Sequence, residues 1–323
     1  MSMQELAQQI LKAPSMLTED NKKDESLAQA IIQLKPQETI LYSVISQFNS
    51  VPLLLQIQSS LSKALQESVQ IQILELTTDP HYLKSAEALL KEIQVPAKLV
   101  RAQIAYLNLL FINDHIIKAQ SIAQSVRASA TQLTPLVQSK LDLISAKISA
   151  AAGDYFQAAG YFQEALNLQN CVLELLLTKL LSGSYHELEK IASEHLTDKT
   201  KLCIELSGIL QSKNNGFLSQ IENISNQIDH VLSEKLLEIE IQKYVKKALK
   251  FYEKVQISHI SEISGVRQDR IADMIQKMIL NDDLEFAVDG RSGVLHRQVK
   301  SVEESVNVLR KGVEVVSALN KWM

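Results

Sequence analysis

Apolar residues recur at helical spacing along most of the chain before residue 250, and short polar or proline-containing breaks separate the helical segments. Before residue 97 the predicted helical segments cover residues 27–48, 53–65, 69–77 and 82–93. Pro52, Pro80 and Pro96 fall between these segments, where proline can begin or end a helix without breaking it. The pattern therefore predicts short helices joined by short connections.

The helical pattern strengthens after Ala97. Asn113 and Asp114 form a polar break between two apolar-faced segments, which predicts a helical hairpin. Further helices are predicted over residues 136–152, 155–168 and 172–181. Residues 153–166 resemble the first helix of a tetratricopeptide repeat, with small residues where neighbouring helices approach and aromatic residues filling the gaps. We therefore expect a stacked helical array rather than a closed bundle.

Residues 251–297 combine two helical patterns with a hairpin pattern. The helical patterns cover residues 257–263 and 267–280, and Gly265 between them is a common residue at a helix C-terminus. From Val288 to His296, two short apolar runs flank a glycine-containing connection, as in a β-hairpin. Helix, turn, helix and hairpin in this order predict a winged helix, preceded by a long helix from about residue 228 to 251.

The last segment carries an apolar seam. Its residues alternate steps of four and three, which is the a/d spacing of a coiled coil. They are Val302, Val306, Leu309, Val313 and Val316. Two interpretations stay open, because such a helix can pack back on its own domain or join helices of other subunits in a bundle.

The predicted fold is dominated by α-helices. A right-handed helical-repeat solenoid, tetratricopeptide-like, is followed by a winged helix with a small β-sheet and by a C-terminal helix. The expected boundaries are 1–227 for the helical array, 228–300 for the winged-helix part and 301–323 for the C-terminal helix.

Composition agrees with a globular helical protein. Of 323 residues, 46% are hydrophobic and 22% charged, and only 9 Gly and 6 Pro interrupt the chain. The N-terminus lacks the pattern of a secretory signal, and no apolar run is long enough to span a bilayer, so we expect no membrane partner and a cytoplasmic and nuclear location. Cys171 and Cys203 form no close pair, and we expect buried, reduced thiols.

Motifs that would indicate catalysis are missing from the sequence. His186-Glu187 begins like the zinc motif H-E-x-x-H, but Lys190 occupies the position of the second metal ligand. The sequence contains no phosphate-binding glycine motif, no G-x-S-x-G and no H-x-H pair. We therefore expect no enzyme activity, no catalytic residues, no metal and no cofactor.

Charge argues against nucleic acid as a partner. The formal net charge is −4, and residues 250–300 contain eight basic and eight acidic residues, so phosphate neutralisation cannot drive strong binding. A winged-helix DNA-binding regulator stays as an alternative from a different functional class. One basic stripe, Lys243, Lys246, Lys247 and Lys250, shares a helix face. It is either a solvated face or a contact for an acidic protein partner.

The order of repeat-like helices, winged helix and terminal helix resembles the PCI domain. Scaffold subunits of the proteasome lid, the COP9 signalosome and translation initiation factor three share this domain. Residues 104–119, 153–159, 274–279 and 287–296 are most similar to the signalosome branch of the family. The wing departs from that branch at Ser292, which stands where the turn usually carries its second acid.

The resemblance implies a non-catalytic scaffold subunit of the COP9 signalosome, which helps position cullin-RING ligase substrates for deneddylation. Its partners would be other PCI subunits, a metalloprotease-type catalytic module and the cullin-RING ligase. The winged-helix strands would form the subunit interface through Ala287, Val288, Val294 and Leu295, and the terminal helix would join a common bundle. A scaffold subunit of the proteasome 19S lid, which shares the same architecture, is the nearest alternative.

Overall fold

The computed structural model describes residues 3–13, 24–34, 36–129, 133–214, 216–290 and 292–298. The chain forms two compact units, Met1–Ser182 and Gly183–Met323, and each is described by itself. The predicted domain boundaries at 227/228 and 300/301 stay predictions. Among the described residues, no helix is long and apolar enough to cross a membrane.

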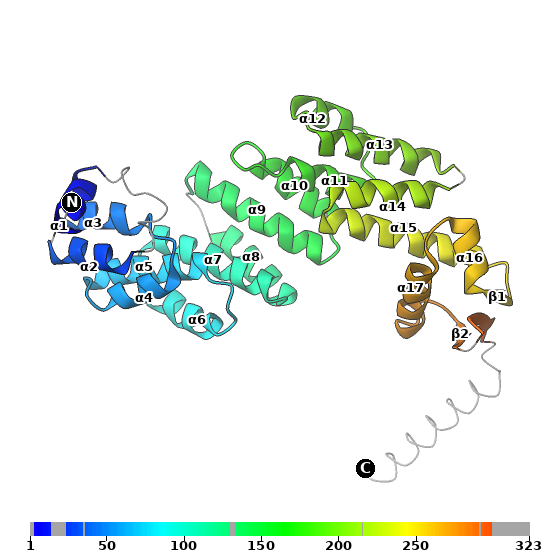
Figure 1. Ribbon diagram of the computed structural model, residues 1–323, viewed down its shortest axis with the longest axis horizontal. Coiled ribbons are helices and arrows are strands. Elements are labelled where there is room, and N and C mark those ends of the chain that lie inside the picture. The colour runs from blue at the N-terminus through cyan, green and yellow to red at the C-terminus, as the bar shows by residue number, and fades with distance from the viewer. Residues whose placement is uncertain are drawn as a thin grey trace, which may run out of the picture. The chain divides into compact units, whose positions relative to one another are not determined.

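The first unit is entirely helical in its described residues (Figure 1). Its helices are α1 (Met3–Lys12), α2 (Glu25–Gln33), α3 (Glu38–Ile45), α4 (Val51–Gln58), α5 (Lys63–Leu76), α6 (Tyr82–Glu92), α7 (Pro96–Ile112), α8 (Ile116–Ser129), α9 (Pro135–Ala151), α10 (Tyr155–Ala165) and α11 (Val172–Ser182). Many of the helices pack on the next one and on the next but one, as α5 does on α6 and α7, and α7 on α8 and α9. This stacking of consecutive helix pairs is the arrangement of helical repeats, as predicted.

Two apolar clusters form the core of this unit in succession along the chain. The first is built from helices α1 to α5 and centres on residues such as Ile31 and Leu54. The second joins α5 to α9 around Tyr106 and Leu141. Because α5 contributes Val69 to the first cluster and Ile71 to the second, this helix connects the two.

Two boundaries predicted near the N-terminus are wrong. The segment 27–48 is two helices, because Pro36 has no N–H group to continue the first helix and disfavours helical geometry just before it. The break predicted between Leu65 and Val69 does not exist, since α5 runs through it. The chain turns earlier instead, at the serine-rich residues 59–62, where hydroxyl groups favour turns over helix.

Helix α10 confirms only part of the tetratricopeptide-like pattern. Asp154 caps its N-terminus by accepting a hydrogen bond from the Gln157 backbone N–H at 3.0 Å. Ala158 and Phe162 are buried, as the pattern predicts, whereas Phe156 is 79% exposed. The aromatic residues of this helix therefore do not all fill gaps between helices.

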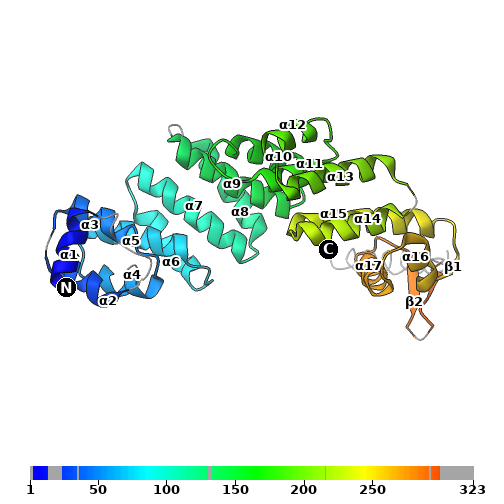
Figure 2. The same cartoon turned by 45° about the horizontal axis from the view of Figure 1, so that its top comes forward.

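The second unit contains helices and a small sheet (Figure 2). Its elements are α12 (Leu188–Glu194), α13 (Asp198–Ser212), α14 (Phe217–Ile228), α15 (Val231–Leu249), β1 (Lys254–Gln256), α16 (Ile257–Ser264), α17 (Gln268–Leu280), β2 (Phe286–Asp289) and β3 (Val294–Arg297). The sequence predicted the two winged-helix helices and the hairpin. It missed α12 to α14, the first helix α1 and the three-residue strand β1.

The winged helix has the order β1-α16-α17-β2-β3. Its strands form an antiparallel sheet with the order β1-β3-β2, and α16 and α17 pack on each other and on α15. Gly265 ends α16 at φ +70°, a left-handed conformation that suits glycine, as the sequence pattern predicted. The long helix α15 begins at Val231 rather than near residue 228, because Asp229 and His230 separate it from α14.

Arg127 ties three consecutive helices of the first unit together. From α8, its guanidinium binds Asp142 of α9, lies 3.7 Å from Glu164 of α10 and stacks 3.9 Å from the ring centroid of Tyr161. The Asp142 side chain is only 3% exposed. Burial raises the pKa of Asp142 above its ordinary value, although the Arg127 charge opposes this shift. The buried Asp142 carboxylate therefore needs the positive charge of Arg127 to balance its own negative charge.

We predict that Arg127→Met lowers the free energy of unfolding of the first unit by about 3 kcal/mol near pH 7, because it leaves a buried carboxylate without its counter-charge. The loss should shrink as the pH falls toward the raised pKa of Asp142, because protonation removes that charge. Urea denaturation followed by circular dichroism measures both values. Glu164→Gln is the control, because the Glu164 side chain is 59% exposed and the change should cost less than about 1 kcal/mol.

Candidate interaction surfaces

The second helix of the winged helix, α17, directs its basic side chains toward acidic residues of the same chain. Arg270 binds Glu234 of α15 and lies 3.4 Å from Glu222 of α14, and its own side chain is 19% exposed. Lys277 lies 3.6 Å from Glu238 of α15. Arg267 lies 3.8 Å from Glu222. Both cations of α17, and Arg267 at its N-cap, are therefore already paired.

The exposed face of α17 has little to offer a polyanion. Besides Arg267 and Lys277, it presents Gln268, Asp269, Asp273, Gln276 and Leu280. In a DNA-binding winged helix this element enters the major groove, and phosphate binding needs unpaired cations nearby. The charges of α17 therefore favour contact with protein over contact with DNA.

The sheet order decides which strand has a free edge. Strand β3 lies between β1 and β2, so its residues Val294 and Leu295 pair on both sides and are 8% and 0% exposed. Ala287 and Val288 lie on β2, which has β3 on one side and no other strand among the described residues on the other. Of the predicted strand residues, the structure brings only Ala287 and Val288 to a free edge, whereas Val294 and Leu295 belong to the central strand.

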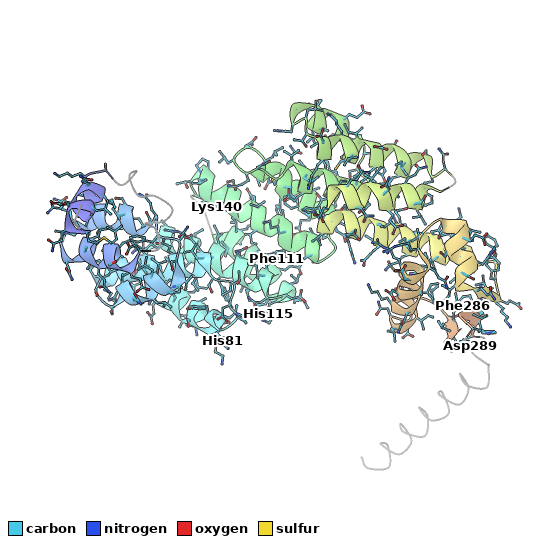
Figure 3. The ribbon with its side chains drawn as sticks, in the orientation of Figure 1. His81, Phe111, His115, Lys140, Phe286 and Asp289 are labelled. Carbon is cyan, nitrogen blue, oxygen red and sulfur yellow. The ribbon has the colours of Figure 1, made fainter. Side chains whose placement is uncertain are left out.

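Backbone direction distinguishes the residues of β2. The Gln298 N–H donates to the Glu285 carbonyl at 2.9 Å, so the alternation of an antiparallel ladder turns the N–H and C=O groups of Ala287 toward β3. The backbone groups of Phe286 and Val288 then point to the open side. The Val288 side chain is 40% exposed, while Phe286 is buried. Phe286 and Asp289, the first and last residues of β2, are labelled in Figure 3. The sequence did not single out Phe286, because its apolar side chain marks the core and only the ladder register shows where its backbone points.

The predicted basic stripe on α15 divides into paired and unpaired lysines. Lys243 donates to Glu240 at 2.7 Å, and Lys246 donates to Asp283 at 2.8 Å. For Lys247 and Lys250, no ion pair occurs with another residue in the described part of the chain. These two exposed cations on the same helix face are the part of the stripe that is free to meet an acidic partner.

The remaining chemical candidates are surface or core residues. His186 and Glu187 are both exposed, and the described residues contain no group of three metal-ligating side chains. Burial raises the pKa of Cys171 to about 11 and that of Cys203 to about 12, so both thiols stay protonated at neutral pH. Cys171 and Cys203 are both buried and free, which confirms the expectation of buried, reduced thiols.

The seam residues of the predicted C-terminal helix cannot be placed. Val302, Val306, Leu309, Val313 and Val316 lie outside the described residues.

Comparison with known proteins gives a distant similarity. No protein-family model matches the chain. Over 237 residues the chain is 23% identical to the probable 26S proteasome regulatory subunit rpn6 of Schizosaccharomyces pombe. The match covers 62% of this chain and 54% of that protein, so the chain spans about half the length of the curated relative it matches.

We predict that Arg270→Met weakens the packing of the winged helix on α14 and α15, because it leaves the largely buried Glu222 carboxylate with one distant cation. The free energy of unfolding of the second unit should fall by about 2–3 kcal/mol, measured by urea denaturation. Arg267→Met is the matched control on the same helix. Its side chain is 71% exposed, and its loss should cost less than about 1 kcal/mol. Equal effects of the two substitutions would contradict the prediction.

Proposed function

We propose that this chain is a non-catalytic scaffold subunit of the PCI type in a lid-like multisubunit complex. The observation that carries the proposal is a winged helix whose α17 cations are paired internally while β2 keeps an open edge. Unpaired backbone groups on an edge strand can extend a sheet across a subunit boundary. The preceding helical repeats and the distant similarity to a proteasome regulatory subunit support the same function.

The proposed interface uses β2 first. Val288 offers an outward N–H, an outward C=O and an exposed apolar side chain, and Ala287 keeps the hairpin paired to β3. Val294 and Leu295 support this edge from the core. The C-terminal helix, through its predicted seam, would add a second contact in a bundle of subunit helices.

Two host complexes remain candidates, each favoured by a different observation. The wing and helical hairpin resemble COP9 signalosome complex subunit 4, which would place the chain beside a metalloprotease-type module acting on cullin-RING ligases in the cytoplasm and nucleus. The similarity to rpn6 favours the proteasome lid instead. The signalosome is our first proposal, because its resemblance includes the wing that forms the proposed interface.

Affinity purification of the endogenous protein followed by mass spectrometry distinguishes these hosts. Signalosome subunits and cullins in the purified material would support the first proposal, and lid and ATPase subunits would support the second. If no PCI-type partner co-purifies, the scaffold function is wrong. Salt-dependent binding of the chain to duplex DNA would then favour the DNA-binding alternative.

We predict that Val288→Pro disrupts assembly without unfolding the subunit. Proline removes the outward N–H of the edge but no hydrogen bond of the β2–β3 ladder. Recovery of PCI-type partners should fall at least about tenfold, which corresponds to about 1.4 kcal/mol. The measurement is quantitative co-purification, with circular dichroism to verify the fold.

Val288→Thr is the matched control for this substitution. It keeps the backbone N–H and a β-branched side chain of similar size, and Thr favours strands. Partner recovery should therefore stay close to that of the original chain. Normal assembly of the proline variant, or equal losses in both variants, would show that the β2 edge does not mediate assembly.

A further inference from the structure

A groove of about 600 Å³ lies in the second unit, beside the C-terminal half of α15. The connection between α13 and α14, the turn after α15 and the end of α16 form its other sides. Phe217, Tyr244, Phe251, Tyr252 and Ile263 give it apolar walls. This volume falls within the usual range of ligand sites, about 300–1,000 Å³.

Contacts between the walls hold the groove in shape. The rings of Phe217 and Tyr244 meet edge to face with centroids 6.3 Å apart, and the Tyr244 hydroxyl donates to the Ile263 carbonyl at 3.2 Å. Tyr252 packs edge to face against His259 of α16 at 6.0 Å. These contacts join α14, α15 and α16, so the groove exists before any ligand binds.

One wall residue is left open to solvent. The Phe251 side chain is 81% exposed at the turn between α15 and β1, where a large aromatic ring has no burial to stabilise it. Exposed aromatic residues on the rim of a preformed groove are typical of binding surfaces, since they bury much area at low conformational cost. Phe251 is therefore a candidate anchor point for a partner.

Lysines surround the apolar walls. Lys213 and Lys243 lie 3.2 Å and 2.7 Å from the Glu240 carboxylate, whose side chain is 6% exposed. Lys247 lines the groove without an ion pair in the described part of the chain. Three lysines therefore face one carboxylate, an excess of two positive charges.

We propose that this groove binds an acidic peptide segment of a partner protein that carries at least one large apolar side chain. The apolar side chain would pack on Phe251 and Tyr244, and carboxylates of the segment would meet Lys247 and Lys213. The buried Glu240 holds two of the lysines in place at the groove. The aliphatic Ile263 and Ala248 favour a peptide side chain over a stack of nucleic-acid bases.

The proposal goes beyond the scaffold function and does not depend on the β2 edge. Lys246 lies on the same helix but outside the groove, and it pairs with Asp283. The groove therefore includes only part of the basic stripe seen in the sequence. It also includes Lys213, Phe217 and Tyr252, which the sequence analysis did not connect.

The test measures binding of a fluorescein-labelled peptide, acetyl-Asp-Glu-Asp-Leu-Phe-Asp-Glu-amide, to the full chain by fluorescence anisotropy. We expect saturable binding that weakens as sodium chloride rises from about 0.05 M to about 0.3 M, because salt screens exposed charges. A peptide with Ser in place of Leu and Phe, and another with Lys in place of the acids, should each bind at least about tenfold more weakly.

Matched variants locate the site. Lys247→Gln should weaken binding about fivefold, and Lys246→Gln on the same helix should not change it. Phe251→Ala should weaken binding about tenfold, whereas Leu280→Ala, an exposed apolar residue of α17 outside the groove, should have no effect. All four residues are exposed, so the variants should fold normally.

Several results would overturn the proposal. No binding of the acidic peptide, or equal losses in the groove variants and their controls, would show that the groove is not the site. Tighter binding of oligothymidylate with the same dependence on Lys247 would assign the groove to nucleic acid. Displacement of the acidic peptide by a peptide of residues 301–323 would assign it to this chain's own C-terminal segment.

Discussion

The ion pairs of Arg270 with Glu222 and Glu234 hold the winged helix to the helices that precede it in the second unit. They join α17 to both α14 and α15. A guanidinium largely removed from water needs its carboxylates, and the carboxylate of Glu222, 13% exposed, needs the guanidinium in return. Arg297 adds a second link, since it donates to the Leu249 carbonyl at 3.0 Å near the end of α15. Together these arginines make the winged helix continuous with the helices that precede it.

The same contacts determine what the winged helix can bind. Because the basic residues of α17 are paired within the chain, the element that would enter a DNA groove has no free cation to offer phosphate. The groups that can still bind a partner are the backbone groups at the β2 edge and the lysines and aromatic rings around the groove at α15. Both surfaces suit protein partners. The proposed assembly function therefore rests on the distribution of charge as much as on the fold.

These two surfaces differ in their physical basis. The β2 edge offers directional backbone hydrogen bonds, which depend little on the partner's side chains. It therefore suits a partner that presents another strand. The groove combines a preformed apolar wall with exposed lysine charges that salt can screen. Binding there therefore depends on the salt concentration and on the partner's side chains. A scaffold subunit with both would hold one partner through backbone geometry and select another through side-chain chemistry.

The sequence by itself determined the helical repeats, the order of the winged helix and the hairpin, because the apolar spacing of α7 to α11, α16 and α17 and the glycine at Gly265 are local signals. The three-residue strand β1 has no periodicity to detect, so the sequence could not show that Val294 and Leu295, which the resemblance assigns to the subunit interface, lie on the central strand. Only the tertiary structure decided which strand is central, which lysines are paired and how Lys213, Phe217 and Phe251 meet in one groove. Strand pairs, ion pairs and the groove each join residues that lie far apart in the sequence. The local spacing of apolar residues does not show which of these distant residues meet.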